Sequence, residues 1–370
     1  MEMKYLLTGG GTGGHIYPAL AVAKEIHYND PTAEILYIGT SRGLESKIVP
    51  EKNIPFKTIN VSGMPRKINK EMLKFSSNFA KGCWQSRKII KDFKPDVVLG
   101  TGGYVCGPII FMSWLQGVPT AIHEQNVVPG ITNKYLARLA DKTLVSFEAS
   151  KKYFPKYKSI SVTGNPRASE INWVDTTEAA DFFGLEKDKK TLLVVSGSQG
   201  AELINNTFME ILEKLLKITW AQTIYVTGER YYHKAKEKMT SENNQIKIYP
   251  YLKEMQLALS LADLVVSRAG ATTIAEITAF GIPSILIPSP NVTNDHQRKN
   301  ANNLVKNNGA IMIEEKDLGP KLLFEKIHDL LKDDNRLTKM KANSLSHGYP
   351  KAAHQVVKIL KKISNSSEKD

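Results

Sequence analysis

Three glycine-rich stretches constrain the fold of this chain more than any other feature of its sequence. They are TGGGTGGH at residues 8–15, GTGGY at 100–104 and SGSQGA at 196–201, and each follows an apolar, strand-like run and precedes a helix-like segment. A strand-to-helix turn built from glycine lets bare backbone N–H groups approach an anion at the positive end of a helix. Two such turns in the first half and one in the second predict two nucleotide-type domains that close on a phosphate-bearing ligand.

Strand-like and helix-like segments alternate along most of the chain, which predicts an α/β fold with parallel sheets and helices on both faces. At 370 residues the chain is long for one hydrophobic core and suits two domains. The predicted domains cover residues 1–165 and 166–349, and a helix at about 350–365 has an apolar side that should pack on another element. Residues 201–216 are expected to form one helix, and the polar stretch 172–190 is expected to lie on the surface.

The uncharged segment at residues 97–122 is the part of the chain that most resembles a membrane span. Glycine and proline interrupt it repeatedly, whereas a spanning helix needs about 20 uninterrupted residues. We therefore interpret it as buried strand, loop, short helix and strand. The first ten residues already hold a strand and a glycine turn, so we expect no cleavable signal peptide. The two cysteines, Cys83 and Cys106, fit free thiols in a reducing compartment.

The positive charge of the chain is unevenly distributed. The net charge is +13, and residues 64–94 contain nine basic residues against two acidic ones, interleaved with large apolar side chains. This combination is what a peripheral membrane-docking surface requires. The alternative is a solvated basic helix whose aromatic side chains face the core. Nucleic acid is not an expected partner, because no helix-turn-helix, zinc or aromatic RNA-binding signature accompanies the charge.

The first glycine stretch invites comparison with two other kinds of phosphate-binding site. Gly9, Gly11 and Gly14 satisfy the G-x-G-x-x-G pattern of dinucleotide-binding dehydrogenases, but the second strand ends YIGT at residues 37–40, without the acidic residue that holds a ribose. A Walker phosphate loop is absent from the sequence. Both observations argue against these two classes.

Polar residues that could take part in catalysis cluster next to the first two glycine stretches. His15 stands just before a helix expected from about Tyr17, and the positive helix end favours a neutral imidazole that can accept a proton. The alternative is a histidine that caps the helix or binds backbone. HEQN at residues 123–126 directly follows a strand, so its side chains are expected to emerge at the carboxyl edge of the sheet, where ligands bind in open α/β folds. Tyr104 is expected at the same edge.

The second half of the chain carries residues suited to a nucleotide sugar. Ser198 and Gln199 offer a hydroxyl and backbone amides to a phosphate, and Glu276 lies in the early turns of a helix, where a carboxylate can bind a ribose diol. NDHQRKNA at residues 294–301 opens a helix with amide side chains suited to sugar hydroxyls. The sequence contains no D-x-D pair, so we expect no metal-chelating diphosphate site of that kind and no cofactor.

Seven segments, taken in order, resemble one family closely. GGGTGGHIYPAL, GTGGYVCGP, HEQN, GNPR, SGSQGA, SRAGATTIAE and NDHQRKNA are similar to the MurG family of N-acetylglucosaminyltransferases, which convert lipid I to lipid II in peptidoglycan synthesis. Two departures are visible, since the family usually has glycine at Ser196 and more often a hydrophobic residue at Thr101. Neither departure removes an amide that faces a phosphate.

The resemblance implies a GT-B fold, in which two Rossmann-like, doubly wound domains face a cleft and the last helix returns to the first domain. It also implies an inverting transfer of GlcNAc from UDP-GlcNAc to the 4-hydroxyl of MurNAc on lipid I. His15 is the expected base or the residue that orients it, with Glu124 as the second choice. The expected substrate-binding or reacting residues are Thr12, Gly13, Gly14, Tyr104 and Asn126 for the acceptor and Arg167, Ser198, Gln199, Leu252, Gly270, Ala271, Thr272, Glu276 and Gln297 for the donor.

The same resemblance favours docking of the basic segment on the cytoplasmic leaflet of the cell membrane. The expected docking residues are Lys70, Met72, Lys74, Phe75, Phe79, Lys81 and Trp84. An anionic membrane surface is therefore an expected partner, beside possible cell-wall synthesis and division proteins. Two other enzyme classes stay open, namely a related transferase with another lipid acceptor and a UDP-GlcNAc epimerase.

Overall fold

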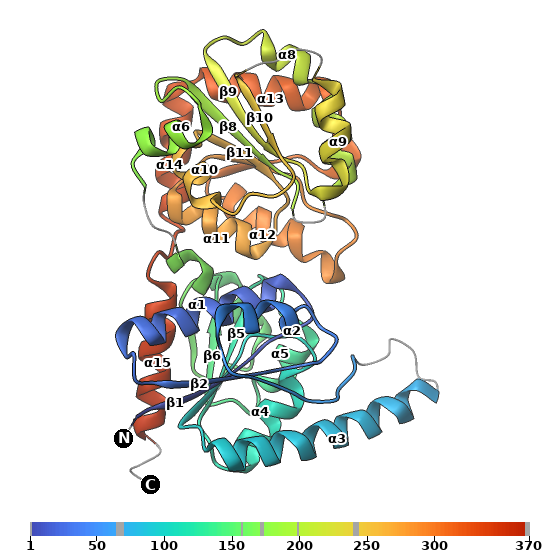
Figure 1. Ribbon diagram of the computed structural model, residues 1–370, viewed down its shortest axis with the longest axis vertical. Coiled ribbons are helices and arrows are strands. Elements are labelled where there is room, and N and C mark those ends of the chain that lie inside the picture. Colours follow the sequence, from blue (N-terminus) through green and yellow to red (C-terminus); the bar gives the residue numbers. More distant parts are fainter. Residues whose placement is uncertain are drawn as a thin grey trace. The chain divides into compact units, whose positions relative to one another are not determined.

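The computed structural model describes residues 2–63, 70–156, 158–170, 174–197, 200–239 and 244–366. Contacts divide the chain into two units, a first unit of Met1–Glu170 with Lys351–Asp370 and a second unit of Ile171–Pro350. Each unit has its own all-parallel sheet with helices on both faces (Figure 1). The predicted α/β class with two doubly wound sheets is confirmed.

The first unit contains a seven-stranded sheet in the order β3-β2-β1-β4-β5-β6-β7. Its central strands are continuous apolar runs, because both faces of the sheet are covered. Tyr5 and Leu7 join one buried cluster, whereas Leu6 between them joins the cluster on the opposite face. The strands are β1 (Lys4–Thr8), β2 (Glu34–Gly39), β3 (Phe56–Thr58), β4 (Val97–Gly100), β5 (Thr120–Glu124), β6 (Lys142–Val145) and β7 (Ile160–Val162).

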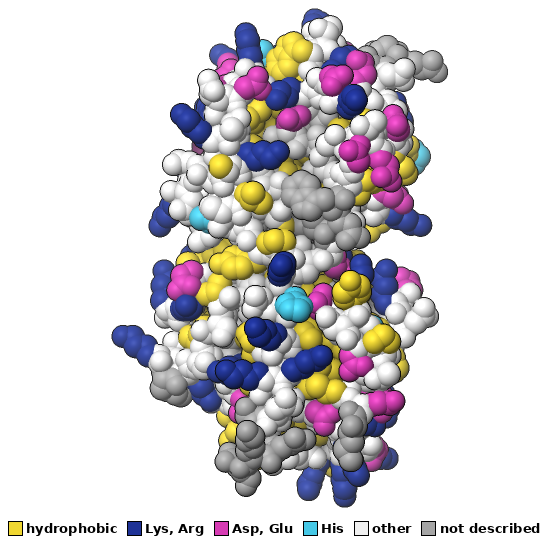
Figure 2. Space-filling model, turned by 90° about the vertical axis from the view of Figure 1, so that its left-hand side faces the viewer, with side chains coloured by type: hydrophobic (Ala, Val, Ile, Leu, Met, Phe, Trp, Pro, Cys, Tyr) yellow, Lys and Arg dark blue, Asp and Glu magenta, His cyan; other side chains and the backbone are white. Residues whose placement is uncertain are grey.

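Two helices distant in sequence, α1 and α15, cover one face of this sheet. Val356, Leu360 and Ile363 of α15 lie in the same buried cluster as Tyr5 of β1. The outer face of α15 is polar, and basic side chains are scattered over the side of the first unit shown in Figure 2. The helices of this unit are α1 (Gly13–Asn29), α2 (Glu45–Ile48), η1 (Pro50–Lys52), α3 (Lys70–Phe93), α4 (Cys106–Leu115), α5 (Ile131–Leu136), η2 (Glu148–Tyr153), η3 (Pro166–Glu170) and α15 (Ala352–Ser366).

The short helix η3 belongs to the first unit, although the predicted boundary lay at residue 165. The Ser169 hydroxyl accepts a hydrogen bond from the Ala353 amide at 2.8 Å, and the Arg167 guanidinium lies 5.3 Å from the centre of the Tyr17 ring. These contacts join η3 to α15 and α1.

The second unit contains a six-stranded sheet in the order β10-β9-β8-β11-β12-β13. Its strands are β8 (Lys190–Val195), β9 (Ala221–Val226), β10 (Ile246–Tyr249), β11 (Leu264–Ser267), β12 (Ser284–Leu286) and β13 (Ala310–Met312). Its helices are α6 (Thr176–Phe183), α7 (Glu202–Met209), α8 (Leu212–Leu216), α9 (Glu229–Lys238), α10 (Met255–Leu261), α11 (Ala271–Phe280), η4 (Thr293–Asp295), α12 (His296–Val305), η5 (Glu315–Asp317), α13 (Pro320–Lys332) and α14 (Asp334–Leu345).

Several predicted elements differ from the structure. Residues 172–190 include α6, which begins at the N-cap Asp175 and buries Ala179, Ala180 and Phe183, so the stretch is not only polar surface. The flanking charges hide this short apolar face in the sequence. Residues 201–216 form two helices, α7 and α8, instead of one. The three-residue strand β13 was not predicted.

The uncharged segment at residues 97–122 forms β4, α4 and part of β5, as predicted. Cys106 is buried and Cys83 half-buried, and both are free thiols. No helix in the described part of the chain has both the length and the apolar character needed to cross a lipid bilayer.

The glycine stretches lie where the strand order of each sheet reverses. In the first sheet the chain leaves β1 for β2 on one side and later adds β4 on the other, and in the second sheet β8, β9 and β11 repeat this arrangement. Loops after two such adjacent strands diverge and form the usual ligand-binding crevice of an open α/β sheet. All three stretches therefore stand at switch points.

Candidate active site

At the first switch point, the loops after β1 and β4 pack directly against each other. The Gly10 amide donates to the Gly102 carbonyl at 3.2 Å, and the Thr101 amide donates to the Thr8 carbonyl at 2.8 Å. A Cβ on Gly102 would lie 2.7 Å from the His15 ring, and one on Gly103 would collide with the Gly10 carbonyl. The glycines of the second stretch therefore leave space for the first loop and for His15. The sequence had predicted that they leave space for an anion.

His15 lies in the first turn of α1, which begins at Gly13 rather than at about Tyr17. Its Nδ1 is 3.0 Å from the carbonyl oxygen of Gly10, a group that only accepts hydrogen bonds, and 3.4 Å from the Thr12 hydroxyl, which can accept as well as donate. The carbonyl partner assigns the hydrogen of the neutral ring to Nδ1 and leaves the lone pair on Nε2. The Thr101 hydroxyl donates to the His15 carbonyl at 2.7 Å and fixes the backbone. The geometry suits a proton acceptor at Nε2.

The start of α1 has open backbone donors. The side chain of its N-cap residue, Thr12, makes no capping hydrogen bond to the helix backbone. Within the described residues, the amides of Gly13 and Gly14 have no acceptor. Unpaired amides at the positive end of a helix attract an anion. Tyr104 stands beside this loop, since a Cβ on Gly11 would lie 3.9 Å from its ring, and it is 36% exposed. The structure thus brings the predicted residues of this loop together with Tyr104.

Glu45 is a residue of this edge that the sequence interpretation missed. It is fully buried, and its carboxylate accepts from the Gly11 amide at 3.0 Å, the Thr40 amide at 3.0 Å and the Thr40 hydroxyl at 2.7 Å. A glutamate in a short helix is ordinarily a surface residue. The two glycines that precede it, Gly39 and Gly43, were the available signal, because a Cβ at either position would overlap its side chain.

The HEQN segment is mostly buried rather than emerging at the sheet edge as expected. The Glu124 carboxylate accepts from the Asn126 amide at 2.9 Å, the Gly130 amide at 3.1 Å and the Asn133 side chain at 2.9 Å. Gln125 donates to the Thr101 carbonyl at 2.8 Å. These side chains face inward because they satisfy backbone groups of neighbouring loops. Asn126 alone of the four is half-exposed.

His123 is the buried histidine of this segment. Its Nε2 lies 2.9 Å from the Gly164 carbonyl, and its Nδ1 lies 3.2 Å from the Gln125 side-chain amide. Burial disfavours the charged ring and lowers the pKa of His123 to about 4. The residue is therefore neutral near pH 7 and ties β5 to the end of β7.

Arg167, predicted on the donor side, lies in the first unit. It forms an ion pair with Glu170 and packs on the ring of Tyr17. The GNPR segment therefore packs beside α1 in the first unit.

At the switch point of the second unit, α11 begins directly after the turn that follows β11. Its N-cap, Gly270, makes no side-chain cap, and among the described residues the amides of Ala271 and Thr272 have no acceptor. An uncapped helix start of this kind binds phosphate groups. Glu276 lies half-buried in the second turn of α11. Ser198 and Gln199, from the loop after β8, lie outside the described residues.

Two further predicted donor residues border the same edge of the second sheet. Leu252 follows β10 and is buried. The side-chain oxygen of Gln297 in α12 accepts from the Ser289 amide at 2.9 Å, which leaves its amide nitrogen to donate to a ligand. Asn300 of the same helix donates to the Ala269 carbonyl at 3.3 Å and holds α12 against the turn before α11.

Arg268 and Glu315 form an ion pair that the sequence interpretation also missed. Arg268 Nη2 lies 2.8 Å from Glu315 Oε1, both side chains are 18% exposed, and Arg268 Nη1 donates to the Ile287 carbonyl at 3.2 Å. The pair joins the turn before α11 to the segments that follow β12 and β13. It therefore positions the helix start that carries the open amides.

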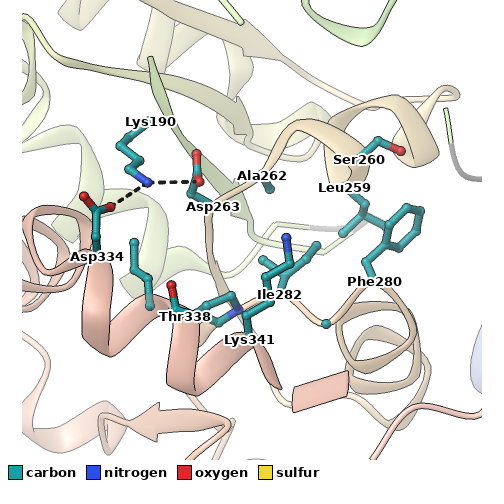
Figure 3. A pocket seen from close by; sticks show the side chains of 13 residues that line it. Lys190, Leu259, Ser260, Ala262, Asp263, Phe280, Ile282, Asp334, Thr338 and Lys341 are labelled. Carbon is teal, nitrogen blue, oxygen red and sulfur yellow. Dashed lines mark ion pairs between the residues drawn. The ribbon is translucent and has the colours of Figure 1, made fainter. Parts of the chain in front are cut away.

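A cavity of about 220 Å³ lies at the opposite, amino-terminal edge of the second sheet. Figure 3 shows Lys190 between Asp334, at 2.8 Å, and Asp263, at 3.6 Å, with Thr338 and Lys341 nearby. None of the predicted substrate-binding residues lines this cavity. In the described part of the chain, no group of three or more His, Cys, Asp or Glu side chains is placed to hold a metal ion.

The predicted docking segment forms α3, whose first half projects from the body of the first unit (Figure 1). The side chains of Lys70 and Lys74 lie outside the described residues. Met72, Phe75 and Phe79 are half-buried, and Phe79 packs on Phe111 of α4 with ring centres 6.5 Å apart. Part of the aromatic face therefore packs on α4.

Large apolar side chains nevertheless remain exposed on α3 and α4, and we call them the α3–α4 patch. Leu73 is 77% exposed, Trp84 67%, Trp114 45% and Leu115 54%. Lys81 lies exposed on the same helix as Trp84. Trp114 and Leu115 were not predicted, because α4 reads as a buried segment in the sequence.

Comparison with known proteins identifies both halves of the chain. Residues 5–145 match the glycosyltransferase family 28 N-terminal domain, and residues 191–356 match the glycosyltransferase family 28 C-terminal domain. The UDP-N-acetylglucosamine–N-acetylmuramyl-(pentapeptide) pyrophosphoryl-undecaprenol N-acetylglucosamine transferase of Natranaerobius thermophilus is 48% identical over 98% of this chain and 100% of its own length. The enzyme of the same name from Halalkalibacterium halodurans is 46% identical over 98% and 99%.

Solved structures agree with this assignment. The crystal structure of Acinetobacter baumannii MurG matches 97% of this chain and 99% of its own with a TM-score of 0.78 and 28% identity. A UDP-GlcNAc 2-epimerase from Neisseria meningitidis matches 98% and 100% with a TM-score of 0.66 but only 14% identity, which shows a common fold alone. The predicted GT-B fold is confirmed. The chain belongs to glycosyltransferase family 28 and, within it, to the MurG family of N-acetylglucosaminyltransferases.

Proposed function

We propose that this chain transfers N-acetylglucosamine from UDP-GlcNAc to the 4-hydroxyl of MurNAc on lipid I, with inversion, and so forms lipid II. The assignment of this reaction rests on the 48% identity to the N-acetylglucosamine transferase of Natranaerobius thermophilus over the full length of that enzyme. The observation that supports the chemistry is His15, which has a hydrogen-bonded Nδ1 and an available Nε2.

In the proposed step, the acceptor binds to the first unit and His15 Nε2 removes the proton of the attacking hydroxyl. The oxygen–anomeric carbon bond forms as the bond from the anomeric carbon to the UDP oxygen breaks, so UDP leaves with the electron pair. Attack opposite the leaving group inverts the anomeric centre. Glu124 is the weaker base, because four hydrogen bonds from Asn126, Gly130 and Asn133 already occupy its carboxylate. Tyr104, Asn126 and the amides of Gly13 and Gly14 would contact the acceptor.

The donor would bind to the second unit. The open amides at the start of α11 suit the diphosphate, Glu276 suits the ribose diol, and the free amide nitrogen of Gln297 suits a GlcNAc hydroxyl. Leu252 would contact the uracil, and Ser198 and Gln199 the diphosphate region. The assignment of Arg167, a residue of the first unit, to the diphosphate region stays a prediction from the family resemblance. In this proposal backbone dipoles stabilise the departing UDP without a metal ion.

We further propose that the chain docks peripherally on the anionic cytoplasmic leaflet through the α3–α4 patch. The supporting observations are its exposed tryptophans and leucines and the exposed basic residues Lys81, Arg87, Lys88 and Lys91 of α3. Apolar insertion combined with basic side chains near anionic headgroups is a stable mode of peripheral binding. Association with cell-wall synthesis and division proteins stays a prediction from the family resemblance.

The test is incubation of the purified protein with labelled UDP-GlcNAc and a lipid I analogue in the presence of EDTA. We expect a β-linked disaccharide on the lipid, and its formation without divalent cations would support both inversion and metal-free catalysis. An α-linked product would contradict inversion. Conversion of UDP-GlcNAc to its 2-epimer, with no transfer, would overturn the proposed function in favour of epimerase activity.

A further inference from the structure

One peptide group lies between His15 and Glu45. The carbonyl oxygen of Gly10 is 3.0 Å from His15 Nδ1, and the N–H of the same peptide group, which belongs to Gly11, donates to Glu45 Oε2 at 3.0 Å. The imidazole and the carboxylate thus bind opposite ends of a single amide. A peptide group is polarised along its C=O and N–H bonds, so a charge at one end strengthens the hydrogen bond at the other.

Glu45 occupies a site shaped for a carboxylate. Its donors are the Gly11 amide and the amide and hydroxyl of Thr40, and no described Lys, Arg or His side chain forms an ion pair with it. A Cβ on Gly10 would lie 2.6 Å from its Oε1, and one on Gly39 would lie 2.5 Å from its Cγ. Since burying a carboxylate without a cation is costly, a function that uses the charge accounts for its presence.

We propose that Glu45 is a positioning residue for His15 and acts through the Gly10–Gly11 peptide group. The hydrogen bond from Gly11 to the carboxylate makes the Gly10 carbonyl a stronger acceptor. That carbonyl holds the hydrogen on Nδ1, keeps the lone pair on Nε2 and stabilises the imidazolium that forms when Nε2 takes the acceptor proton. The arrangement follows the logic of a catalytic triad, in which a third group orients the base. The inference rests on the proposed role of His15 as base.

The other groups around this loop are neutral or lie on different peptide groups. The Tyr37 hydroxyl donates to the Gly9 carbonyl at 2.7 Å, and Cys106 contacts the Thr8 and Gly102 carbonyls. Burial raises the pKa of Cys106 to about 12 and that of Tyr37 well above its usual value, so both are uncharged near pH 7. The neutral hydroxyl of Thr12 lies 3.4 Å from His15 Nδ1, Tyr104 lies beside Gly11, and Arg167 of η3 packs on the Tyr17 ring of α1.

The first measurement is the tautomer of His15 in the wild-type protein by ¹⁵N NMR after labelling of histidine. The His15 signals are identified by their loss in His15→Ala. We expect the neutral ring to carry its hydrogen on Nδ1. A ring protonated on Nε2 would overturn the proposal, and this result does not depend on the folding of any variant at Glu45.

The second measurement uses Glu45→Gln, which keeps the side-chain size and removes the charge. We expect kcat to fall at least about 10-fold, the KM for UDP-GlcNAc to stay the same and the Nδ1–H tautomer to lose population. In a His15→Ala background the same change should cause no further loss of kcat. The matched control is Tyr37→Phe, which removes a hydroxyl from the neighbouring peptide group of the same loop and should leave the His15 tautomer as in the wild type.

These outcomes separate the proposal from a structural role and from the proposed function. An equal loss of kcat with and without His15, or an unchanged tautomer in Glu45→Gln, would make Glu45 a purely structural residue. Wild-type-like turnover of His15→Ala would remove His15 as base. That result would overturn the base assignment of the proposed function, while the NMR measurement would still decide whether Glu45 controls the ring.

Discussion

The two units share strand order and a switch point, yet they complete that edge in different ways. In the first unit, the buried carboxylates of Glu45 and Glu124 accept hydrogen bonds from backbone amides of the loops, and His15 lies beside the open amides at the start of α1. In the second unit, the start of α11 keeps open amides. The Arg268–Glu315 ion pair holds the turn before this helix in place. Both edges offer open amides to an anion, and we propose that the first edge, which also carries His15, performs the proton transfer. The difference lies in loop residues, since the fold is the same.

The strongest test of this contrast is His15→Ala. If the first edge performs the proton transfer, turnover should fall at least about 100-fold, the lower part of the range for loss of a general base. The KM for UDP-GlcNAc should change little, because the donor is assigned to the second unit. Steady-state kinetics with both substrates varied provide the measurement. A large change in the donor KM would break the proposed division of roles.

Acid should destabilise the first unit through His123. Its pKa is about 4 in the folded state and about 6.5 in an unfolded chain, so protons bind more tightly to the unfolded chain. The contribution of His123 to the free energy of unfolding is therefore fully present above pH 6.5. Roughly 3 kcal/mol of it is lost as the pH falls to about 4. Hydrogen exchange across this range should show β4–β6 losing protection before β8–β11.

The control for this prediction is His123→Gln, which keeps a donor for the Gly164 carbonyl but does not titrate. In this variant, hydrogen-exchange protection of β4–β6 should be lower at pH 7 than in the wild type, and it should change less between pH 6.5 and 4. An unchanged slope would assign the acid sensitivity to other groups.

Glu276→Ala tests the second edge. Loss of a charged hydrogen-bond partner of the ribose should raise the KM for UDP-GlcNAc about 10- to 100-fold and affect the KM for the acceptor little. Glu276→Gln, which can still accept one hydrogen bond, should show an intermediate value. Isothermal titration with UDP would measure the same loss without turnover. A selective effect on the acceptor would contradict the assignment of the donor to this unit.

The smallest expected effect concerns membrane binding, which only the first unit is proposed to provide. Lys81→Glu should weaken binding to anionic vesicles about 5-fold or more in low salt, since each basic residue near the leaflet contributes about 1 kcal/mol. Trp84→Ser should weaken binding with little dependence on salt. Lys339→Glu on α14 applies the same charge change to an exposed residue of the second unit and should have no effect. Equal losses from both charge reversals would indicate nonspecific attraction.

Much of the fold and part of the site follow from local sequence patterns. Apolar runs followed by glycine turns predicted the order of most strands and helices, because a buried parallel strand leaves a continuous hydrophobic signal. The rule that ligands bind at switch points placed His15 and Tyr104 at one edge. The seven segments together predicted the family and its reaction.

Tertiary structure decided how the polar groups of the edge are used. Gly102 and Gly103 are required by contacts with His15 and Gly10, residues roughly ninety positions away, which no local pattern encodes. Most of HEQN faces inward, Glu45 is buried and Arg268 is half-buried, because each satisfies backbone groups that only the assembled loops bring within reach. The sequence by itself therefore determined the fold and the family, and it predicted His15 as the candidate base. Which side chains support that base was decided by long-range packing, since a hydrogen-bond partner is selected by position in space and not by spacing along the chain.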